Sequence, residues 1–369
     1  MGEMKAIRWG IWGTGAIAHS VAADFPFVKG ALVQAVASRT GQHAQRFATR
    51  FGVPKFYTGI EPLLNDSEVD VVYVATPNSR HMQDSVACME AGKAVLCEKP
   101  FAINLAEAQR IVATAQQRKV FCMEAMWTRF IPAVIEVKRL IDSGAVGPIR
   151  LMQGNFAYPV PAGVDSRLFD ADAGGGALLD RGVYLISLAQ HLLGAPESIS
   201  GAACLGATGV DEQSAYQLVH KGGALADFAA SLRTRGTNEV TISGASAVIC
   251  MCEPFYRAHR IVTQTFGTPQ ANAAVEPGAG GLKDSPSIKA LRRRLSPLLE
   301  MLQRGRVQTF PFPGNGYQFE LQHVTDCLTE QRLESAIMPL SDSLEVMRTM
   351  DVLHAQMYTQ NSIQAMREI

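Results

Sequence analysis

The stretch G-I-W-G-T-G-A-I-A, residues 10–18, decides the fold of the first part of the chain. It places glycines at 13 and 15 and a small residue at 18, in the spacing G-x-G-x-x-A, directly after an apolar run. In a strand–turn–helix unit, the first glycine permits the tight turn and the second lets a pyrophosphate approach the helix N-terminus, while the small residue lets helix and strand pack closely. The stretch predicts dinucleotide binding; the alternative is a purely structural glycine turn. The binding residues expected here are Gly13, Thr14, Gly15, Ala16 and Ile17.

The first third of the chain alternates short apolar runs with stretches of helical periodicity. Strands of a parallel sheet are buried on both faces and need such runs, and repeated strand–helix–strand units wind into a doubly wound sheet. Residues 1–125 are therefore predicted to form an α/β Rossmann domain that binds NAD(P). The expected strands lie at 7–12, 31–37, 69–75, 94–97 and 120–123.

The pattern changes after residue 126, where several apolar runs follow one another with Gly and Asn turns between them. This predicts an α+β domain over 126–369 with a largely antiparallel open sheet, which would bind substrate and another subunit. Residues 267–306 are rich in Gly, Ala and Pro and then basic, which indicates an insertion. Helices are expected at 130–143, 174–193, 316–330 and 341–358, and strands near 197–204, 214–220, 224–232, 237–243 and 246–252.

The composition excludes several classes of function. Lys plus Arg and Asp plus Glu each total 34 among 369 residues, so neither nucleic acid nor an anionic membrane is an expected partner. No apolar run approaches the roughly 18 residues of a membrane span, and no leader is expected at the N-terminus. The seven cysteines form no C-x-x-C and the eight histidines show no metal-ligand spacing, which predicts reduced cysteines in the cytoplasm and no metal.

The end of the second expected strand favours one nicotinamide cofactor over the other. An acidic residue there would bind the ribose 2′-hydroxyl of NAD, but the sequence has Ser38, Arg39 and Thr40. A guanidinium and two hydroxyls suit the 2′-phosphate of NADP. NADP is therefore the expected cofactor and NAD remains possible.

Two further loops follow parallel strands and should meet the same crevice. The first contains Thr76, Pro77, Asn78 and His81, any of which can instead end the strand or cap the next helix. The second is V-L-C-E-K-P-F, residues 95–101, in which Glu98 and Lys99 precede a proline. The proline keeps Lys99 out of the next helix, so the lysine is expected to project towards the nicotinamide and stabilise a developing alkoxide.

The combined motifs resemble the Gfo/Idh/MocA oxidoreductase family, and within it the branch of dimeric dihydrodiol dehydrogenases and NADP-linked xylose dehydrogenases. The stretches that carry the resemblance are E-K-P at 98–100, E-A-M-W-T-R-F-I-P at 124–132, G-G-G-A-L-L-D-R-G-V-Y at 174–184, G-N-G-Y-Q-F-E at 314–320 and M-P-L-S-D-S-L-E-V-M-R-T-M-D at 338–351. The resemblance implies that Lys99 is the active-site lysine. In the family's D-x-G-x-H-x-x-D segment, Asp180 matches the first acid, Tyr184 stands at the histidine and Ser187 at the second acid. The substrate-lining residues it implies are Trp127, Arg129 and Phe156.

The spacing of the expected catalytic residues also makes chemical sense. Asp180 and Tyr184 are four residues apart and share a helix face. A tyrosine with a pKa near 10 is a proton donor at neutral pH, and an adjacent Lys99 ammonium is expected to lower that pKa. The alternative is that Tyr184 merely packs in a buried helix.

These observations predict an NADP-dependent dehydrogenase that acts on a secondary alcohol or hemiacetal carbon of a sugar or cyclic diol. A homodimer or homotetramer is expected. The alternative is a sensor that binds NAD(P) without turnover, and a nucleic-acid-binding protein is remote.

Overall fold

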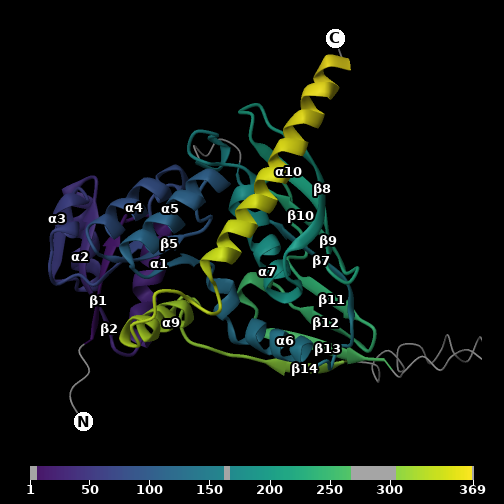
Figure 1. Ribbon diagram of the computed structural model, residues 1–369, viewed down its shortest axis with the longest axis horizontal. Coiled ribbons are helices and arrows are strands. Elements are labelled where there is room, and N and C mark those ends of the chain that lie inside the picture. The colour runs from purple at the N-terminus through teal and green to yellow at the C-terminus, as the bar shows by residue number, and fades with distance from the viewer. Residues whose placement is uncertain (1–5, 162–166, 267–304, 368–369) are drawn as a thin grey trace, which may run out of the picture.

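The computed structural model describes residues 6–161, 167–266 and 305–367, with side chains up to residue 359. These residues form two sheets that lie side by side, one with six strands and one with eight (Figure 1). The predicted insertion at 267–306 lies outside the described residues except for its last two.

The first sheet is the predicted doubly wound sheet. Its strand order is β3-β2-β1-β4-β5-β6 and every neighbouring pair is parallel. The strands are β1 (Ile7–Trp12), β2 (Ala31–Ser38), β3 (Lys55–Thr58), β4 (Val71–Val74), β5 (Ala94–Glu98) and β6 (Cys122–Ala125). The helices between them are α1 (Ala16–Asp24), α2 (Gly41–Phe51), α3 (Glu61–Leu64), α4 (His81–Glu90) and α5 (Leu105–Arg118). The strand order reverses between β1 and β4, and a crevice forms at the carboxyl ends of strands at such a point.

The second sheet is the predicted, largely antiparallel one, in the order β14-β13-β12-β11-β7-β10-β9-β8. One neighbouring pair within it, β7 with β10, is parallel. Its strands are β7 (Ile149–Ala157), β8 (Pro196–Leu205), β9 (Asp211–His220), β10 (Leu225–Ser231), β11 (Val240–Gly244), β12 (Ala247–Met251), β13 (Arg260–Thr265) and β14 (Arg306–Thr309). The fold class predicted from the sequence is confirmed, whereas the division into folding units at residue 125 stays a prediction.

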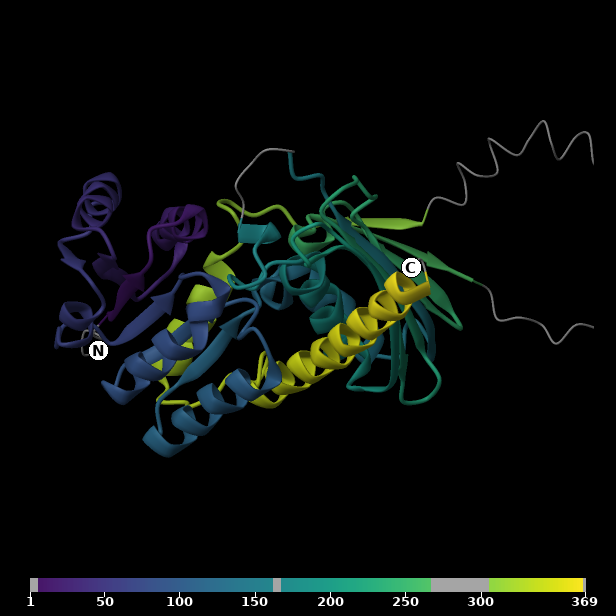
Figure 2. The same ribbon diagram turned by 90° about the horizontal axis from the view of Figure 1, so that it is seen from above.

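Helices cover one face of the second sheet (Figure 2). They are α6 (Pro132–Asp142), α7 (Val183–Leu193) with a preceding π-helical turn (Leu178–Gly182), and α10 (Leu340–Arg367). Of these, α6 and α7 lie on the side that faces the first sheet, and α10 packs on α5, α7 and β8. Helix α9 (Gln318–Thr329) lies beside the first sheet instead, where it packs on β1. Short 3₁₀ helices lie at Phe25–Phe27, Asn78–Arg80, Trp127–Phe130, Arg167–Phe169 and Phe255–Arg257.

The opposite face of the second sheet points outward and is mixed in character. Along β9 and β10, buried residues alternate with exposed ones, and the exposed positions include Gln217, Asp227 and Leu225. Successive strand residues point to opposite faces, so the polar residues at alternate positions lie on the outward face and are solvated.

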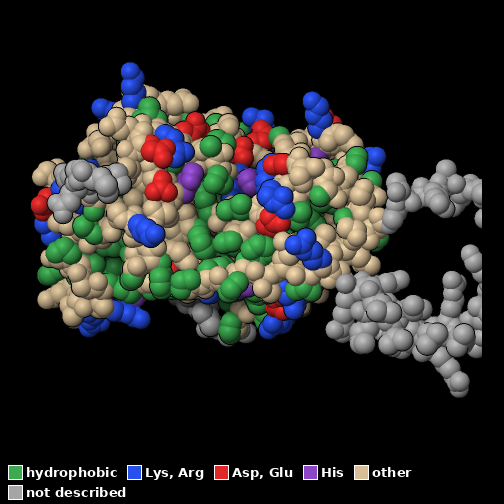
Figure 3. Space-filling view, turned by 90° about the horizontal axis from the view of Figure 1, so that it is seen from below, with side chains coloured by type: hydrophobic (Ala, Val, Ile, Leu, Met, Phe, Trp, Pro, Cys, Tyr) green, Lys and Arg blue, Asp and Glu red, His purple; other side chains and the backbone are tan. Residues whose placement is uncertain are grey.

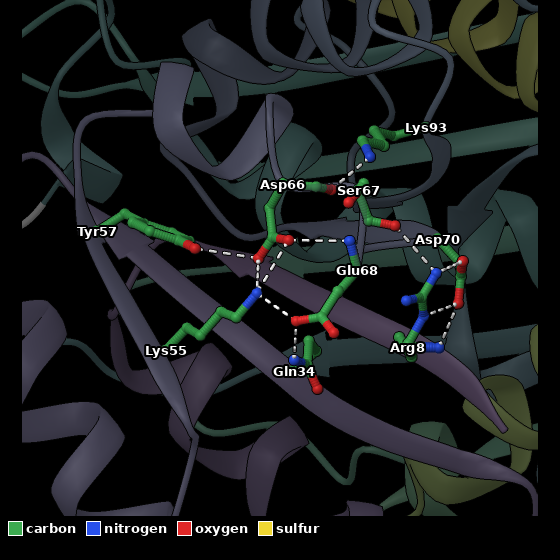
Figure 4. Close-up of polar contacts among 9 residues, drawn as sticks. All are labelled: Arg8, Gln34, Lys55, Tyr57, Asp66, Ser67, Glu68, Asp70 and Lys93. Carbon is green, nitrogen blue, oxygen red and sulfur yellow. Dashed lines mark hydrogen bonds and ion pairs between the residues drawn. The ribbon is translucent and has the colours of Figure 1, made fainter.

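A network of ion pairs joins strands at the amino-terminal edge of the first sheet, away from the carboxyl edge (Figure 4). Asp66 accepts hydrogen bonds from Lys55 Nζ at 3.0 Å and Tyr57 Oη at 3.0 Å. Arg8 makes a two-pronged contact with Asp70, with Nη2 2.7 Å from one carboxylate oxygen and Nε 2.9 Å from the other. The network fastens β3 and the turn before β4 to the rest of the sheet.

Charged side chains of both signs are interspersed on the underside of the molecule, with hydrophobic side chains between them (Figure 3). That face therefore shows no large field of one sign. Among the described residues, no helix has the length and apolar character needed to cross a bilayer.

Candidate active site

A cleft of about 1150 Å³ opens at the carboxyl edge of the first sheet. Residues at the ends of β1, β2 and β5 and in the loop after β4 border it on one side, and Arg167 and Tyr184 reach it from the second part of the chain. All fourteen expected cofactor residues line this cleft: Gly13, Thr14, Gly15, Ala16, Ile17, Ser38, Arg39, Thr40, Thr76, Pro77, Asn78, His81, Glu98 and Lys99.

The glycine loop leaves room for a ligand at the start of α1. Gly13 has a φ of +109°, and a Cβ there would lie 2.4 Å from the backbone oxygen of Ala75, so no larger residue fits. A Cβ at Gly15, the N-cap of α1, would meet nothing within 4 Å, and no side chain caps the helix. Free N–H groups that face open space at a helix N-terminus suit a pyrophosphate.

The end of β2 carries cationic and hydroxyl groups. Arg39 and Thr40 are exposed at the cleft, and Thr14 Oγ1 lies 3.3 Å from Ser38 Oγ. His43, on the first turn of α2, also lines the cleft and was not expected from the sequence. The arrangement offers positive charge and hydroxyl donors where a carboxylate would otherwise bind a ribose.

The loop after β4 is hydrogen-bonded to the second part of the chain, and the His81 ring that follows it bonds to the loop after β5. Asn78 Nδ2 donates to the Gly174 oxygen at 2.9 Å, and Asn78 Oδ1 accepts from Arg167 Nη1 at 3.2 Å. The buried His81 ring places its nitrogens 2.8 Å from the Pro100 oxygen and 2.9 Å from the Thr76 oxygen. His81 thus positions the loops, whereas Thr76 Oγ1 is buried without a partner and is free to contact a ligand.

The Lys99 ammonium is held in place by Asp180, which lies just before α7. Its Nζ donates to the Asp180 backbone oxygen at 2.8 Å and lies 3.3 Å from Asp180 Oδ1. The same ammonium lies 4.7 Å from the centre of the Tyr184 ring, over its face. The π-helical turn before α7 carries Asp180, and the first turn of α7 carries Tyr184. Lys99 therefore contacts both Asp180 and Tyr184, and the side chains of Lys99 and Tyr184 line the cleft.

Three cations surround the Asp180 carboxylate. Besides Lys99, Arg167 Nη2 lies 3.7 Å from Oδ1 and Arg181 Nε lies 3.8 Å from Oδ2. Burial alone would raise the pKa of Asp180, but these cations outweigh it and lower the pKa. Asp180 is therefore an anion that fixes the position of the Lys99 ammonium.

The pKa of Tyr184 is raised, and not lowered as was expected from the neighbouring Lys99 ammonium. Burial raises the pKa of Tyr184 well above its usual value, and the negative groups around it, including Glu98, act in the same direction. The contact that opposes this rise is a hydrogen bond from Trp127 Nε1 to Tyr184 Oη, 3.1 Å long. Lys99 contacts the ring face instead of the hydroxyl group.

Aromatic side chains surround Tyr184. The ring of Phe156 lies 5.2 Å from that of Tyr184 and stacks on Tyr256 at 4.5 Å. Trp127 lies 4.5 Å from the ring of Tyr317. Two of the three expected substrate-lining residues, Trp127 and Phe156, thus contact the expected catalytic tyrosine.

The third expected substrate-lining residue, Arg129, has a different position. Its side chain is 0% exposed, donates to Ser187 Oγ at 2.9 Å and pairs with Asp342 at 2.5 Å. The guanidinium fastens α7 to the start of α10, and Arg129 is not among the residues that line the cleft. Ser187, at the family's second acidic position, is the acceptor of this buried arginine.

Several cleft residues were missed by sequence reasoning because they belong to no local motif. Arg167 enters the cleft from the second domain, and Arg80 lies on the rim with its guanidinium 2.9 Å from Asp84. Glu98 lines the cleft as expected, and its carboxylate accepts hydrogen bonds from Tyr73 Oη and the Lys99 backbone N–H. Arg80 and Arg167 lie on short 3₁₀ helices that the tertiary fold brings to the cleft.

Comparison with known proteins agrees with this geometry. Residues 7–126 match the model of the oxidoreductase family with an NAD-binding Rossmann fold, and residues 134–250 match the GFO/IDH/MocA C-terminal domain. Trans-1,2-dihydrobenzene-1,2-diol dehydrogenase of Mus musculus is 32% identical over 356 residues, which cover 92% of this chain and 93% of that protein. The Danio rerio protein of the same name is 39% identical over 255 residues, or 66% of this chain and 74% of that protein.

Solved structures share the fold. An aldose-aldose oxidoreductase from Caulobacter crescentus superposes with a TM-score of 0.79 at 22% identity, over 96% of this chain and 98% of that one. A 3-ketoreductase from Actinomadura kijaniata, in complex with NADP and TDP-benzene, gives 0.77 at 24% identity, over 95% and 98%.

The chain belongs to the Gfo/Idh/MocA family of oxidoreductases. It is a dehydrogenase whose Rossmann domain takes a nicotinamide cofactor.

Proposed function

We propose that the protein is an NADP-dependent dehydrogenase that interconverts a secondary alcohol, or a sugar hemiacetal, and its carbonyl form. The meeting of Lys99, Asp180 and Tyr184 at the cleft is the observation that carries this proposal. The names of its relatives support a ring-shaped sugar or a cyclic diol as the substrate class. A sensor without turnover would have no need of these three side chains in contact.

The cofactor would be held by the glycine loop, by Thr76 and by the groups at the end of β2. Bound there, it supplies or accepts the hydride at nicotinamide C4. Gly15 and the N-terminus of α1 would face the pyrophosphate, and Arg39 the 2′-phosphate, which is why we propose NADP before NAD. The protein's own part is to orient the two reacting carbons.

Lys99 and Tyr184 have different roles at the substrate oxygen. The Lys99 ammonium, fixed by Asp180, donates to this oxygen and stabilises negative charge as the alkoxide develops. Tyr184 exchanges the proton: its hydroxyl gives a proton to the oxygen when a carbonyl is reduced, and its phenolate takes the proton back when an alcohol is oxidised. Because burial raises the pKa of Tyr184, the neutral donor form prevails at neutral pH.

Trp127 acts on Tyr184 as a positioning residue. Its indole N–H donates to Tyr184 Oη, so the tyrosine's own O–H is directed elsewhere and can point to a substrate. The same donor stabilises the phenolate, since hydrogen bonds to a charged acceptor are stronger than those to a neutral one. We assign to Trp127 the tuning of Tyr184 that was expected of Lys99.

The second domain is proposed to bind substrate and to join a second subunit through its outward sheet face. This face has no covering helix among the described residues and exposes Leu225 and Val307 among polar side chains. We also propose a cytoplasmic location, because all seven cysteines are free.

A substrate panel tests the proposed function. Aldoses, keto sugars and cyclic trans-diols are each offered with NADP or NADPH, and cofactor absorbance is followed. Turnover of at least one class is expected. Tight NADPH binding that no compound of the panel perturbs or turns over would support the sensor and contradict the proposal.

A further inference from the structure

The outward face of the second sheet carries a cluster of three side chains that the proposed reaction does not use. Glu239 lies immediately before β11, Cys250 lies on β12 and Cys252 directly follows it. One ligand atom of each, two sulfurs and a carboxylate oxygen, all lie within 4.8 Å of one another. None of the three residues lines the cofactor cleft.

Strand pairing fixes these three positions. Cys250 and Cys252 are two residues apart, so their side chains leave the strand on the same face. The strands β11 and β12 are antiparallel with Val240 opposite Met251, which brings Glu239 beside Cys252. A hydrogen-bonded ladder thus holds all three side chains together without any ion.

We propose that Cys250, Cys252 and Glu239 form a zinc site with water at the fourth position. Zinc prefers thiolate and carboxylate ligands in a tetrahedron, at about 2.0–2.3 Å from the metal. Ligand atoms at the corners of such a tetrahedron lie roughly 3.3–3.8 Å apart, so the three atoms here need to close in by only about 1 Å. Side-chain rotation can supply a movement of this size.

Arg260 provides a partner behind the ligands. Its Nε donates to Cys252 Sγ at 3.3 Å, and its backbone oxygen accepts from the Cys252 N–H at 3.1 Å. A hydrogen bond to a coordinating thiolate orients the ligand and tunes its charge. Zn²⁺ and the guanidinium together balance the charge of two thiolates and one carboxylate, so the loaded site is neutral.

The site is open to solvent on one side, because Glu239 and Cys250 are partly exposed while Cys252 is buried. A thiol loses its proton when it binds a metal ion, so zinc binding should release protons. Two sulfur ligands select a borderline-soft ion such as zinc over magnesium or calcium, which prefer oxygen.

Metal titration of the full chain tests the proposal. The protein is stripped with a chelator, kept in a reductant, and titrated with Zn²⁺ against a chromogenic chelator. We expect one tight zinc per chain, and a thiolate-to-metal charge-transfer band when Co²⁺ replaces zinc. The double variant Cys250→Ser/Cys252→Ser should lose both signals, and Arg260→Gln should bind zinc about 10- to 100-fold more weakly.

Cys204→Ser is the matched control, because Cys204 is an exposed cysteine on β8 of the same sheet. Its zinc affinity should equal that of the wild type. Wild-type zinc affinity no greater than that of the double variant, or a cobalt spectrum without the charge-transfer band, contradicts the proposal. Thermal unfolding and NADPH binding of each variant show that loss of zinc is not loss of the fold.

Discussion

At the scale of single residues, the proposed chemistry rests on which donor reaches which oxygen. Trp127 Nε1 donates to Tyr184 Oη, Lys99 Nζ is bound by Asp180, and the Tyr184 hydroxyl is left for the substrate. A raised pKa of Tyr184 makes its neutral form the ready acid for carbonyl reduction. The same shift makes the base form scarce, so alcohol oxidation should need alkaline conditions.

The pH dependence of the two directions should therefore differ. Alcohol oxidation requires the Tyr184 phenolate, so its kcat should rise about tenfold per pH unit from neutral pH and show no plateau below about pH 10. Carbonyl reduction uses the protonated form, which is fully populated there, and should stay flat. Initial rates in both directions across the pH range check this. A plateau for oxidation near neutral pH would show that another group takes the proton.

Trp127→Phe removes the indole donor and keeps a ring. Hydrogen bonds to charged groups contribute about 1.5–3 kcal/mol, so the rising limb of alcohol oxidation should move to higher pH by about one to two units. The affinity for NADPH should not change. Phe156→Leu is the control, since Phe156 contacts the Tyr184 ring with no polar group; it should change KM but leave the limb in place. If the rising limb of the pH profile does not move in Trp127→Phe, Trp127 acts only through packing and does not stabilise the phenolate.

Arg39→Ala tests the cofactor assignment. Loss of a charged hydrogen bond to the 2′-phosphate should weaken NADP binding by roughly 10- to 150-fold and leave NAD nearly unchanged. Arg46→Ala serves as the control, because Arg46 is an exposed arginine on the nearby helix α2 that lies outside the cleft. Titration of each variant with both cofactors measures the two affinities. Equal losses of affinity for NADP and NAD would show that Arg39 does not bind the 2′-phosphate.

At the scale of elements, the sequence predicted most of the first sheet because its apolar runs and glycine loop are local signals. It missed β3, a four-residue edge strand with the partly polar sequence Lys-Phe-Tyr-Thr. It also missed β13 and β14, which lie on either side of residues 267–304 and pair only with each other and β12. These strands are fixed by the strands with which they pair, and a single sequence shows little of that pairing.

The residues of the candidate site also fall into those that a local motif predicts and those that only the tertiary fold brings in. Residues of the glycine loop and the Glu98–Lys99 turn follow from motifs, and all of those expected at the cofactor line the cleft. Arg167 could not be found, since it reaches the cleft from the second domain. Arg129 was misplaced because the sequence does not show that Asp342 and Ser187 occupy its guanidinium. The zinc site that we propose could not be predicted from the sequence either, because only the pairing of β11 with β12 brings Glu239 beside Cys252.

The ion network of Figure 4 tests what holds β3 in place. The Asp66 side chain is 6% exposed; burial would raise its pKa, but the Glu68 N–H, Lys55 and Tyr57 lower it. Asp66→Asn should reduce the free energy of unfolding by about 1.5–3 kcal/mol. Asp142→Asn, in an exposed pair with Lys138, should cost less than about 1 kcal/mol.

The sign of the pH effect follows from the lowered pKa. The stabilisation from Asp66 is complete above the unfolded-state pKa of about 3.9 and is lost as the pH falls through the lower folded-state value. Urea unfolding should therefore show a constant difference between wild type and Asp66→Asn above about pH 5, which shrinks below about pH 4. A difference that grows in acid would contradict this assignment.

At the scale of the whole molecule, the carboxyl edge of the first sheet forms one cleft with Arg167 and Tyr184, and no helix among the described residues covers the outward face of the second sheet. That face is mixed rather than apolar, so the proposed subunit contact should be polar at its rim. Sedimentation at micromolar concentration should show a dimer or a larger assembly. Gln153→Arg, at an exposed position of the central strand β7, should weaken the association of subunits, whereas Gln117→Arg on α5 should not. A monomeric wild type would remove this proposal.

Substitution of Tyr184 tests the central claim most directly. Tyr184→Phe keeps the ring contacts with Lys99 and Phe156 and removes only the hydroxyl group. General acid–base catalysis contributes about 10²–10⁴ in rate, so kcat should fall at least about 100-fold while NADPH binding, followed by fluorescence, stays near normal. Lys99→Met should be comparably damaging, and the two losses should not add, because the residues act together. If Tyr184→Phe retains nearly full turnover while Lys99→Met does not, the lysine is the proton carrier and Tyr184 does not exchange the proton.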